Sequence, residues 1–456
     1  MRLKIAIDKL RCIVIRRHAE TLFCTAQGVK QAVGFKWAGE GCIKLAETAR
    51  PGRAGCPSAA ECYASFGLAS RLAGGHVGVP DAGSREQEAA GRRLAFAVEG
   101  TARTEKTMIT ENKRLVEKDA KLNRDDLIVI GGAGGFIGGA LARHFTKKGF
   151  RRIRAADKKP LPEWYQRVPG VECLNLDLSV EANCKRVCEG AVEVYNLAAD
   201  MGGMGFIERF RVECLRSVLI NTHMIEAAYR AGARRYFYSS SACAYNTDLQ
   251  RDPKVRALKE SDAYPAMAER GYGWEKLISE MFCQEYWAER GMKTAIARFH
   301  NVYGPWGTWD GGREKAPAAI CRKAAEAIDA GKHTITIWGD GHQTRSFMYI
   351  DDCVKGIDMI MHCDALIATP INLGSSELVT INELVSKVER IAGVKLNREY
   401  DLTAPRGVAG RNSDNTFIQK MLKWEPNTPL DMGLSATYKW IKQQLAARKS
   451  GKRVVD

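Results

Sequence analysis

The stretch IVIGGAGGFIG at residues 128–138 constrains the fold of this chain more than any other feature of the sequence. It reads as a buried strand, a glycine loop and the start of a helix, with Gly132, Gly135 and Gly138 spaced three residues apart. Such glycines make a tight turn, let a pyrophosphate approach the backbone and let the helix pack closely against the strand. The helix N-terminus then directs free N–H groups at the phosphates. Because glycine loops also occur in unrelated proteins, the pattern needs support from other parts of the chain.

From residue 125 onward, apolar segments of strand length alternate with helical patterns. We expect strands at 127–130, 153–157, 171–178, 191–199, 235–242 and 293–304, and the clearest helices at 136–148, 216–231 and 275–290. This alternation is typical of a doubly wound parallel sheet. The sequence therefore predicts an α/β fold with a Rossmann domain over 125–305. A smaller C-terminal substrate-binding domain, partly interleaved with it, is expected over 306–445.

Residues 1–107 have a different character, because they are rich in Ala, Gly and Arg and lack sustained helical or strand periodicity. The segment GHVGVPDAGSREQEAAGRR at 75–93 is typical of a disordered linker. We interpret 1–107 as a disordered or poorly packed N-terminal extension. A transit peptide, or non-native sequence preceding a true start at Met108, are alternative interpretations.

Composition narrows the class of ligand. The formal net charge is +16, but the basic residues do not form one long run, which favours a phosphate-bearing small molecule over a nucleic acid. The 14 cysteines are scattered without a CxxC pair and histidines number only 8, so we expect buried thiols of a reducing compartment and no metal site. No apolar run reaches membrane-spanning length, so we expect no membrane partner.

Acidic residues follow the second and third predicted strands. A carboxylate at Asp157 would accept hydrogen bonds from the adenosine ribose and repel a 2′-phosphate, which favours NAD over NADP, although Lys158 and Lys159 weaken this discrimination. Asp177 is suited to the adenine. The predicted cofactor-binding residues are Gly132, Gly135, Phe136, Ile137, Gly138, Asp157, Asp177, Tyr272 and Lys276.

Tyr272 and Lys276 form a Y-x-x-x-K pattern at the start of a predicted helix, so both side chains lie on one helix face. The ammonium and a positively charged nicotinamide would both favour the phenolate and lower the pKa of Tyr272. Lys276 can also hold the nicotinamide ribose. Ser241, at the end of the fifth predicted strand, is the expected third member and would polarise a substrate hydroxyl.

Longer strings make the interpretation more specific: LAADMGGMGFI at 197–207, REKAPAA at 313–319, WGDGHQTRSF at 338–347 and GRNSDN at 410–415. With the glycine loop and the Tyr/Lys pair, they resemble the extended short-chain dehydrogenase/reductase family of nucleotide-sugar enzymes. Within that family they are similar to the plant GDP-mannose 3,5-epimerases. The resemblance covers about 125–444.

The chain departs from the plant pattern at four positions, Gly131, Gly138, His342 and Ala409. Ala409 stands where the pattern has Arg. This change removes a positive charge near the expected diphosphate.

The resemblance implies a reaction in three stages. Oxidation at C4 by a bound NAD, with Tyr272 taking the hydroxyl proton, acidifies the C–H bonds at C3 and C5. Cys243 and Lys315 then exchange protons at these carbons, and the hydride returns to C4. A thiol near positive charge and a desolvated amine both titrate readily, which suits them to this task.

The resemblance also implies a substrate site for GDP-mannose, a homodimer and a cytoplasmic role in ascorbate biosynthesis. The implied substrate residues are Gly202, Ser241, Ala242, Cys243, Asn301, Glu314, Lys315, Ala316, Lys323, Gln343, Thr344, Arg345 and Arg411. Alternatives on the same scaffold are a 4-epimerase and a 4,6-dehydratase, the latter disfavoured because Ala242 and Cys243 stand where an acidic pair is expected. A nucleotide-sugar-binding protein without activity is a third reading, against which the intact Ser/Tyr/Lys set argues.

Overall fold

The computed structural model describes residues 121–405 and 407–452, together with the strands at 21–26, 29–38 and 42–46. The chain divides into two compact units, Met1–Met108 and Ile109–Asp456. In the first unit, β1 (Thr21–Ala26), β2 (Val29–Ala38) and β3 (Cys42–Ala46) form an antiparallel sheet in the order β1-β2-β3.

The sequence analysis predicted no strands in residues 1–107, and the interpretation of this segment as a disordered or poorly packed extension stays a prediction. Within β2, Val33, Phe35 and Trp37 alternate with smaller or polar residues, a pattern typical of a strand that the overall composition had obscured. The predictions made for the rest of this segment lie outside the described residues.

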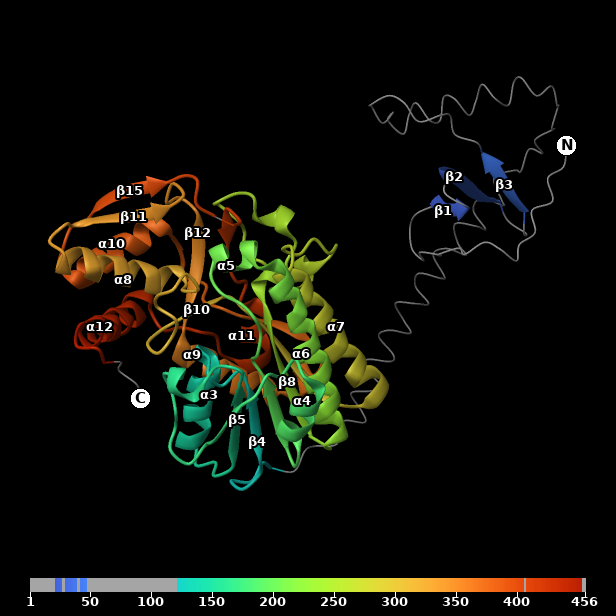
Figure 1. The fold of residues 1–456 in the computed structure, drawn as a ribbon, viewed down its shortest axis with the longest axis horizontal. Coiled ribbons are helices and arrows are strands. Elements are labelled where there is room, and N and C mark those ends of the chain that lie inside the picture. Colours follow the sequence, from blue (N-terminus) through green and yellow to red (C-terminus); the bar gives the residue numbers. More distant parts are fainter. Residues whose placement is uncertain (1–20, 27–28, 39–41, 47–120, 406, 453–456) are drawn as a thin grey trace, which may run out of the picture. The chain divides into compact units, whose positions relative to one another are not determined.

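The second unit is built around a seven-stranded parallel sheet in the order β13-β9-β8-β7-β4-β5-β6 (Figure 1). Its strands are β4 (Ile128–Gly131), β5 (Ile153–Asp157), β6 (Glu172–Asn175), β7 (Glu193–Asn196), β8 (Arg235–Ser241), β9 (Lys293–Phe299) and β13 (Pro370–Leu373). Since β4 pairs with both β5 and β7, the strand order reverses there, which places a ligand crevice at the carboxyl end of β4. The predicted doubly wound fold is confirmed.

Helices cover both faces of this sheet. On one face α3 (Phe136–Lys147) and α9 (Ile350–Met361) contribute to a core with the sheet, and on the other α4 (Glu181–Cys188), α6 (Arg211–Arg230) and α7 (Tyr272–Arg290) form a second core. Their apolar residues recur at helical spacing, so each helix buries one stripe.

The strand predicted over 293–304 is wrong as a single element. It divides into β9, which pairs with β8 and β13, and β10 (Asn301–Tyr303), which pairs with β12 (Thr344–Tyr349) in a separate sheet. His300 lies at the break, where its backbone N–H donates to the Leu373 carbonyl at 3.1 Å. No Gly or Pro separates the two halves, so the sequence carries no turn signal at the change in pairing partner.

A further core gathers the C-terminal helices beyond the carboxyl ends of the main sheet (Figure 1). Its buried residues come mainly from α8 (Ala316–Asp329), α10 (Ile381–Ala392), α12 (Leu430–Lys449), β11 (Thr334–Trp338) and β14 (Leu378–Thr380), with contributions from β10 and β12. β15 (Asn397–Asp401) pairs with β11, and β16 (Gly410–Arg411) pairs with β12. The described residues also form the helices α5 (Met204–Arg209) and α11 (Thr416–Leu422). Because α9 and β13 come from this half of the chain yet complete the main sheet and its core, the two halves interleave. The boundary at residue 305 stays a prediction.

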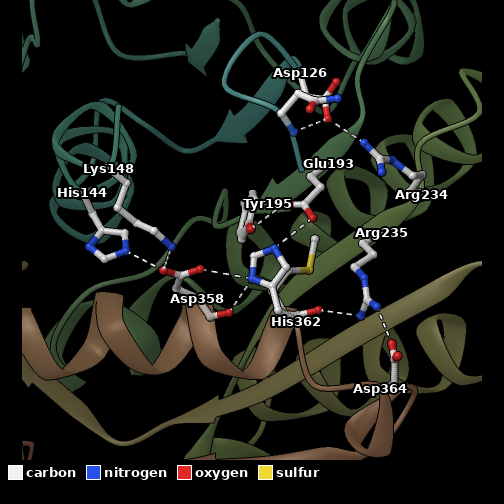
Figure 2. A network of polar contacts seen from close by, with 12 residues as sticks. Asp126, His144, Lys148, Glu193, Tyr195, Arg234, Arg235, Asp358, His362 and Asp364 are labelled. Atoms are coloured by element: carbon white, nitrogen blue, oxygen red, sulfur yellow. Dashed lines mark hydrogen bonds and ion pairs between the residues drawn. The ribbon is translucent and has the colours of Figure 1, made fainter. Parts of the chain in front are cut away.

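A polar network ties α9 to the main sheet (Figure 2). The Asp358 carboxylate accepts hydrogen bonds from His144 Nε2 at 2.7 Å and Lys148 Nζ at 2.5 Å, both on or just after α3. The His362 ring contacts Asp358 Oδ1 at 3.1 Å and Glu193 Oε1 at 3.0 Å. Although burial opposes the charge, these carboxylates raise the pKa of His362 to about 10. The protonated imidazole therefore links α9 to β7.

Candidate active site

A cavity of about 1390 Å³ extends from the glycine loop, along the carboxyl ends of the parallel strands, to the C-terminal elements. Single small-molecule sites usually measure about 300–1,000 Å³, so this cavity has room for a dinucleotide and a second ligand. Its walls contain the predicted residues Gly132, Gly135, Phe136, Ile137, Gly138, Asp157, Asp177, Ser241, Ala242, Cys243, Tyr272, Lys276, Asn301, Glu314, Lys315, Ala316, Lys323, Gln343, Arg345 and Arg411. Tertiary structure thus brings segments far apart in the sequence to one site.

The glycine loop has the geometry that a pyrophosphate site requires. Gly132 has φ +79°, and a Cβ there would lie 2.7 Å from the Ala198 backbone nitrogen. A Cβ on Gly138 would lie 2.4 Å from the Gly132 carbonyl oxygen, so only glycine permits this approach of α3 to the loop. α3 begins after Gly135 without a side-chain cap, which leaves its first N–H groups available to an anion.

Asp157 ends β5 and lines the cavity, as the ribose interaction requires. Its carboxylate accepts a hydrogen bond from the Lys159 backbone N–H at 2.8 Å, and burial raises its pKa. The neighbouring ammonium groups are directed at protein acceptors, Lys158 at Asp200 Oδ2 (2.6 Å) and Lys159 at the Gly134 carbonyl (3.0 Å). These partners reduce the tendency of both lysines to attract a 2′-phosphate.

Tyr272 and Lys276 lie one turn apart at the start of α7, and both are buried. Lys276 Nζ is 5.3 Å from the centre of the Tyr272 ring and 4.9 Å from that of Tyr238. Burial raises the pKa of Tyr272 well above its usual value, Cys243 and Glu275 act in the same direction, and a hydrogen bond with Ser241 opposes them. The protein residues alone therefore do not produce the lowered pKa that the sequence predicted.

Ser241 and Cys243 are held together at the end of β8. The Ser241 hydroxyl accepts a hydrogen bond from the Cys243 backbone N–H at 3.2 Å, which caps the short 3₁₀ turn Ala242–Ala244. Cys243 lines the cavity with only 6% of its surface exposed. Burial and the Glu269 carboxylate raise the pKa of the thiol, whereas the positive charges of Arg411 and Lys315 lower it.

Lys315 lies just before α8 and donates a hydrogen bond to the Gly202 carbonyl at 3.0 Å. Burial lowers the pKa of its amine, while Cys243 and Glu269 raise it. Cys243 and Lys315 therefore influence each other electrostatically across the cavity wall. Burial makes the thiol less acidic and the ammonium more acidic.

Three further predicted substrate residues line the cavity from β10, from α8 and from the turn before β12. Lys323 Nζ donates to the Thr336 carbonyl at 2.7 Å, Gln343 Nε2 donates to the Trp338 carbonyl at 2.8 Å, and Asn301 Nδ2 donates to the Ser346 carbonyl at 3.2 Å. Each side chain is thus oriented by a backbone group.

Two predicted substrate residues, Gly202 and Thr344, are not among the cavity-lining residues. Gly202 acts through its carbonyl, which orients Lys315. The Thr344 hydroxyl donates to the Pro253 carbonyl at 2.5 Å and is therefore committed to another loop.

Sequence reasoning missed two residues near the Cys243 thiol, Gln250 and Glu269. Both contact the guanidinium of Arg411, which itself donates to Cys243 Sγ at 3.4 Å. Neither residue belongs to a recognisable motif. The sequence shows Arg411 within GRNSDN but not that it is buried. Only this burial indicates that the guanidinium needs acidic or amide partners elsewhere in the chain.

Among the described residues, no group of three or more His, Cys, Asp and Glu side chains is arranged to hold a metal ion. Of the helices that the structure describes, none combines the length and the apolar character needed to cross a membrane.

Comparison with known proteins agrees with this geometry. Residues 128–374 match the NAD dependent epimerase/dehydratase family. The chain is 45% identical over 324 residues to GDP-mannose 3,5-epimerase of Arabidopsis thaliana, covering 71% of this chain and 84% of the relative. It is 44% identical to GDP-mannose 3,5-epimerase 1 of Oryza sativa subsp. japonica, covering 71% of this chain and 83% of the relative.

Solved structures share the fold. A UDP-glucose 4-epimerase of Thermotoga maritima, crystallised with UDP-glucose, superposes with a TM-score of 0.62 at 21% identity, covering 70% of this chain and 99% of the other. A UDP-glucose 4-epimerase of Thermus thermophilus, in complex with NAD, superposes with a TM-score of 0.59 at 17% identity, covering 69% and 98%.

Proposed function

The chain belongs to the NAD dependent epimerase/dehydratase family and is an NAD-dependent nucleotide-sugar epimerase, and we propose that it converts GDP-mannose to GDP-L-galactose by epimerisation at C3 and C5. One observation carries the proposal: Ser241, Tyr272 and Lys276 line the same cavity as the pair Cys243 and Lys315. The first set serves oxidation and reduction, and the pair serves proton exchange. A 4-epimerase needs only the first set.

The residues of the glycine loop and β5 fit NAD. The uncapped start of α3 suits the pyrophosphate, Asp157 suits the adenosine ribose, and the buried Lys276 suits the nicotinamide ribose. When bound, NAD supplies a hydride acceptor for C4 and returns the hydride at the end of the reaction. Asp177 lies in the same part of the cavity and is assigned to the adenine.

Tyr272 is the base for the C4 hydroxyl. Its phenol is hydrogen-bonded with Ser241, which positions both oxygens for the same substrate hydroxyl. Lys276 Nζ lies 5.3 Å from the centre of the Tyr272 ring. Its positive charge stabilises the phenolate that forms when the phenol has lost its own proton. The C4 ketone produced in this step acidifies the C–H bonds at C3 and C5.

Cys243 and Lys315 exchange the protons at these two carbons. General acid–base groups work best when their pKa values lie near the working pH, and burial moves the amine of Lys315 downward toward that range. The positive charges of Arg411 and Lys315 favour the Cys243 thiolate against the opposing effect of burial. One group removes a proton while the other donates one, so the configuration at the carbon inverts.

The part of the cavity that α8 and β12 line is assigned to the nucleotide. Lys323, Gln343 and Arg345 lie there, and ammonium and guanidinium groups suit phosphate oxygens. Asn301 and the segment 314–316 line the part assigned to the sugar. The resemblance also implies Arg411 as a substrate residue; it lines the cavity, and its guanidinium contacts Cys243.

A homodimer in the cytoplasm completes the proposal, with a role in the supply of ascorbate. Exposed apolar side chains recur at helical spacing on α6 (Val212, Leu215 and Leu219) and on α7 (Trp274, Ile278 and Met281). A second copy of the chain would cover such a face. A Leu215→Glu variant should shift the full chain from dimer to monomer in light scattering, whereas a wild-type monomer would contradict the assignment.

The reaction is tested with the full chain, GDP-mannose and NAD in deuterated water, followed by NMR of the sugar. We expect deuterium at both C3 and C5. Inversion at C4 with both C–H protons retained would identify a 4-epimerase, and absence of turnover would identify a binding protein. Either result would overturn the proposal.

A further inference from the structure

The sulfur of Cys243 faces a guanidinium whose nitrogens are divided among three partners. Arg411, in β16, donates from Nη1 to Cys243 Sγ at 3.4 Å, from Nε to Gln250 Oε1 at 2.6 Å, and from Nη2 to the Glu269 carboxylate. Arg411 is only 6% exposed. A planar guanidinium held at several edges has little freedom to rotate, so its contact with the sulfur is defined by the other two.

Gln250 and Glu269, the two residues that anchor the Arg411 guanidinium, are themselves held by backbone hydrogen bonds. Gln250 is fully buried, its Nε2 donates to the Asn246 carbonyl at 3.1 Å, and its own carbonyl accepts from the Ala409 N–H at 2.9 Å. The backbone N–H of Glu269 donates to the Cys243 carbonyl at 3.1 Å. Glu269 is therefore tied to the residue whose side chain Arg411 contacts.

The neighbouring arginine is arranged differently. Arg345 lies directly opposite Arg411 in the β12–β16 pair, and its Nη atoms donate to the backbone carbonyls of Thr344 at 2.7 Å and Val408 at 2.5 Å. The described hydrogen bonds thus direct the half-buried Arg345 at backbone oxygens and the buried Arg411 at a thiol and two side chains. The thiol contact is specific to Arg411 and its anchors.

We propose that Glu269 and Gln250 are positioning residues that hold the Arg411 guanidinium against the Cys243 sulfur, where it stabilises the thiolate. This inference rests on the proposed role of Cys243 in proton exchange. A cation in contact with sulfur favours the thiolate, which is the form able to accept a proton from carbon. The Glu269 carboxylate alone would disfavour a thiolate by repulsion, so its place beside Cys243 is explained by what it does to Arg411.

The two effects of Glu269 have opposite signs, and this makes the inference testable. The full chain with bound NAD is treated with iodoacetamide over a range of pH, and the alkylation of Cys243 is followed by peptide mass spectrometry, since the chain has 14 cysteines. In Glu269→Gln, loss of repulsion alone would speed alkylation, whereas release of Arg411 would slow it. We expect alkylation to be about 10-fold slower near pH 7 and its midpoint to move up by about one pH unit. An unchanged or faster rate would overturn the inference.

A second variant removes the anchor without changing any charge. Gln250→Leu should slow alkylation of Cys243 in the same direction, and a wild-type rate would count against the inference even if Glu269→Gln did not fold. Arg411→Gln should slow it at least as much, and adding Glu269→Gln to it should cause no further slowing. In every sample, the half-buried Cys363 and the buried Cys353 report whether the fold is intact.

Failure of this inference can be told apart from failure of the proposed reaction. Thiol alkylation needs no substrate, whereas deuterium exchange in the wild-type chain does. If the wild type exchanges deuterium but Glu269→Gln alkylates at the wild-type rate, only the positioning role is wrong. If the wild type exchanges no deuterium but Glu269→Gln alkylates slowly, only the proposed reaction is wrong.

Discussion

Replacing Cys243 by serine should separate oxidation at C4 from proton exchange at C3 and C5. A hydroxyl has a far higher pKa than a thiol, so Cys243→Ser removes a titratable group while keeping a similar shape. Tyr272 and Lys276 lie on α7, and the Ser241 oxygen is held by the backbone N–H of residue 243, which the substitution retains. The hydride step should therefore survive.

The size of the effect follows from the task assigned to the thiol. A general acid–base group contributes about 10²–10⁴-fold, which corresponds to about 3–5 kcal/mol of the barrier to proton transfer. A serine oxygen also forms shorter contacts than sulfur, so the 3.4 Å contact between Arg411 Nη1 and Cys243 Sγ would not be reproduced without movement of the guanidinium. We expect deuterium exchange to fall by about 10²-fold or more.

Two measurements on the same sample give the comparison. Absorbance of NADH during a single turnover reports oxidation at C4, and NMR in deuterated water reports exchange at C3 and C5. The matched control is Cys363→Ser, the same chemical change at a half-buried cysteine beyond the end of α9, which should leave both signals as in the wild type. If Cys243→Ser exchanges deuterium at the wild-type rate, Cys243 is only a core thiol and the proposed proton exchange is wrong.

Three further predictions follow from the site and from the network around α9. Asp157→Ala should weaken NAD binding by about 10-fold in a calorimetric titration, through loss of hydrogen bonds to the ribose, and unchanged affinity would mean that another acid fills this role. Lys315→Ala should block inversion more than single-face exchange, so a variant that still forms the epimer at the wild-type rate would exclude Lys315 as the proton donor. His362→Gln should lower the urea midpoint most below about pH 6.5, where the imidazole is charged in both states, and the loss should shrink as pH rises through about 10, because the carboxylates of Asp358 and Glu193 raise the pKa of His362 only in the folded protein. A destabilisation that grows with rising pH would show that this ring is not the charged link.

Local features were predictable where a residue's own chemistry decides the structure. The glycine loop follows from the need for positive φ at Gly132 and for close approach at Gly138. The five inner strands β5, β4, β7, β8 and β9 are largely buried, which makes their apolar segments readable in the sequence. α7 was readable from Tyr272 onward because its apolar residues keep a helical period.

Predictions failed where two segments of similar pattern differ only in their partners. Residues 293–304 mix apolar and polar side chains without a Gly or Pro before Gly304, yet β9 and β10 belong to different sheets. The sequence did not predict β13, whose residues 370–373 become a strand of the main sheet through pairing with β9. The pKa of Tyr272 also departs from expectation, because burial is a property of the folded site and outweighs the neighbouring ammonium.

The sequence by itself determined the glycine loop, the Tyr272/Lys276 spacing and the alternation of strands and helices, because these depend on neighbours within a few residues. The tertiary structure alone decided that Gln250 and Glu269 contact Arg411, and that Arg411 contacts Cys243. These contacts join residues 142 to 168 positions apart, and no local period or propensity records such a separation. A buried guanidinium must be hydrogen-bonded, because burying an unpaired charge is costly. Which residues become its partners depends on how the whole fold packs.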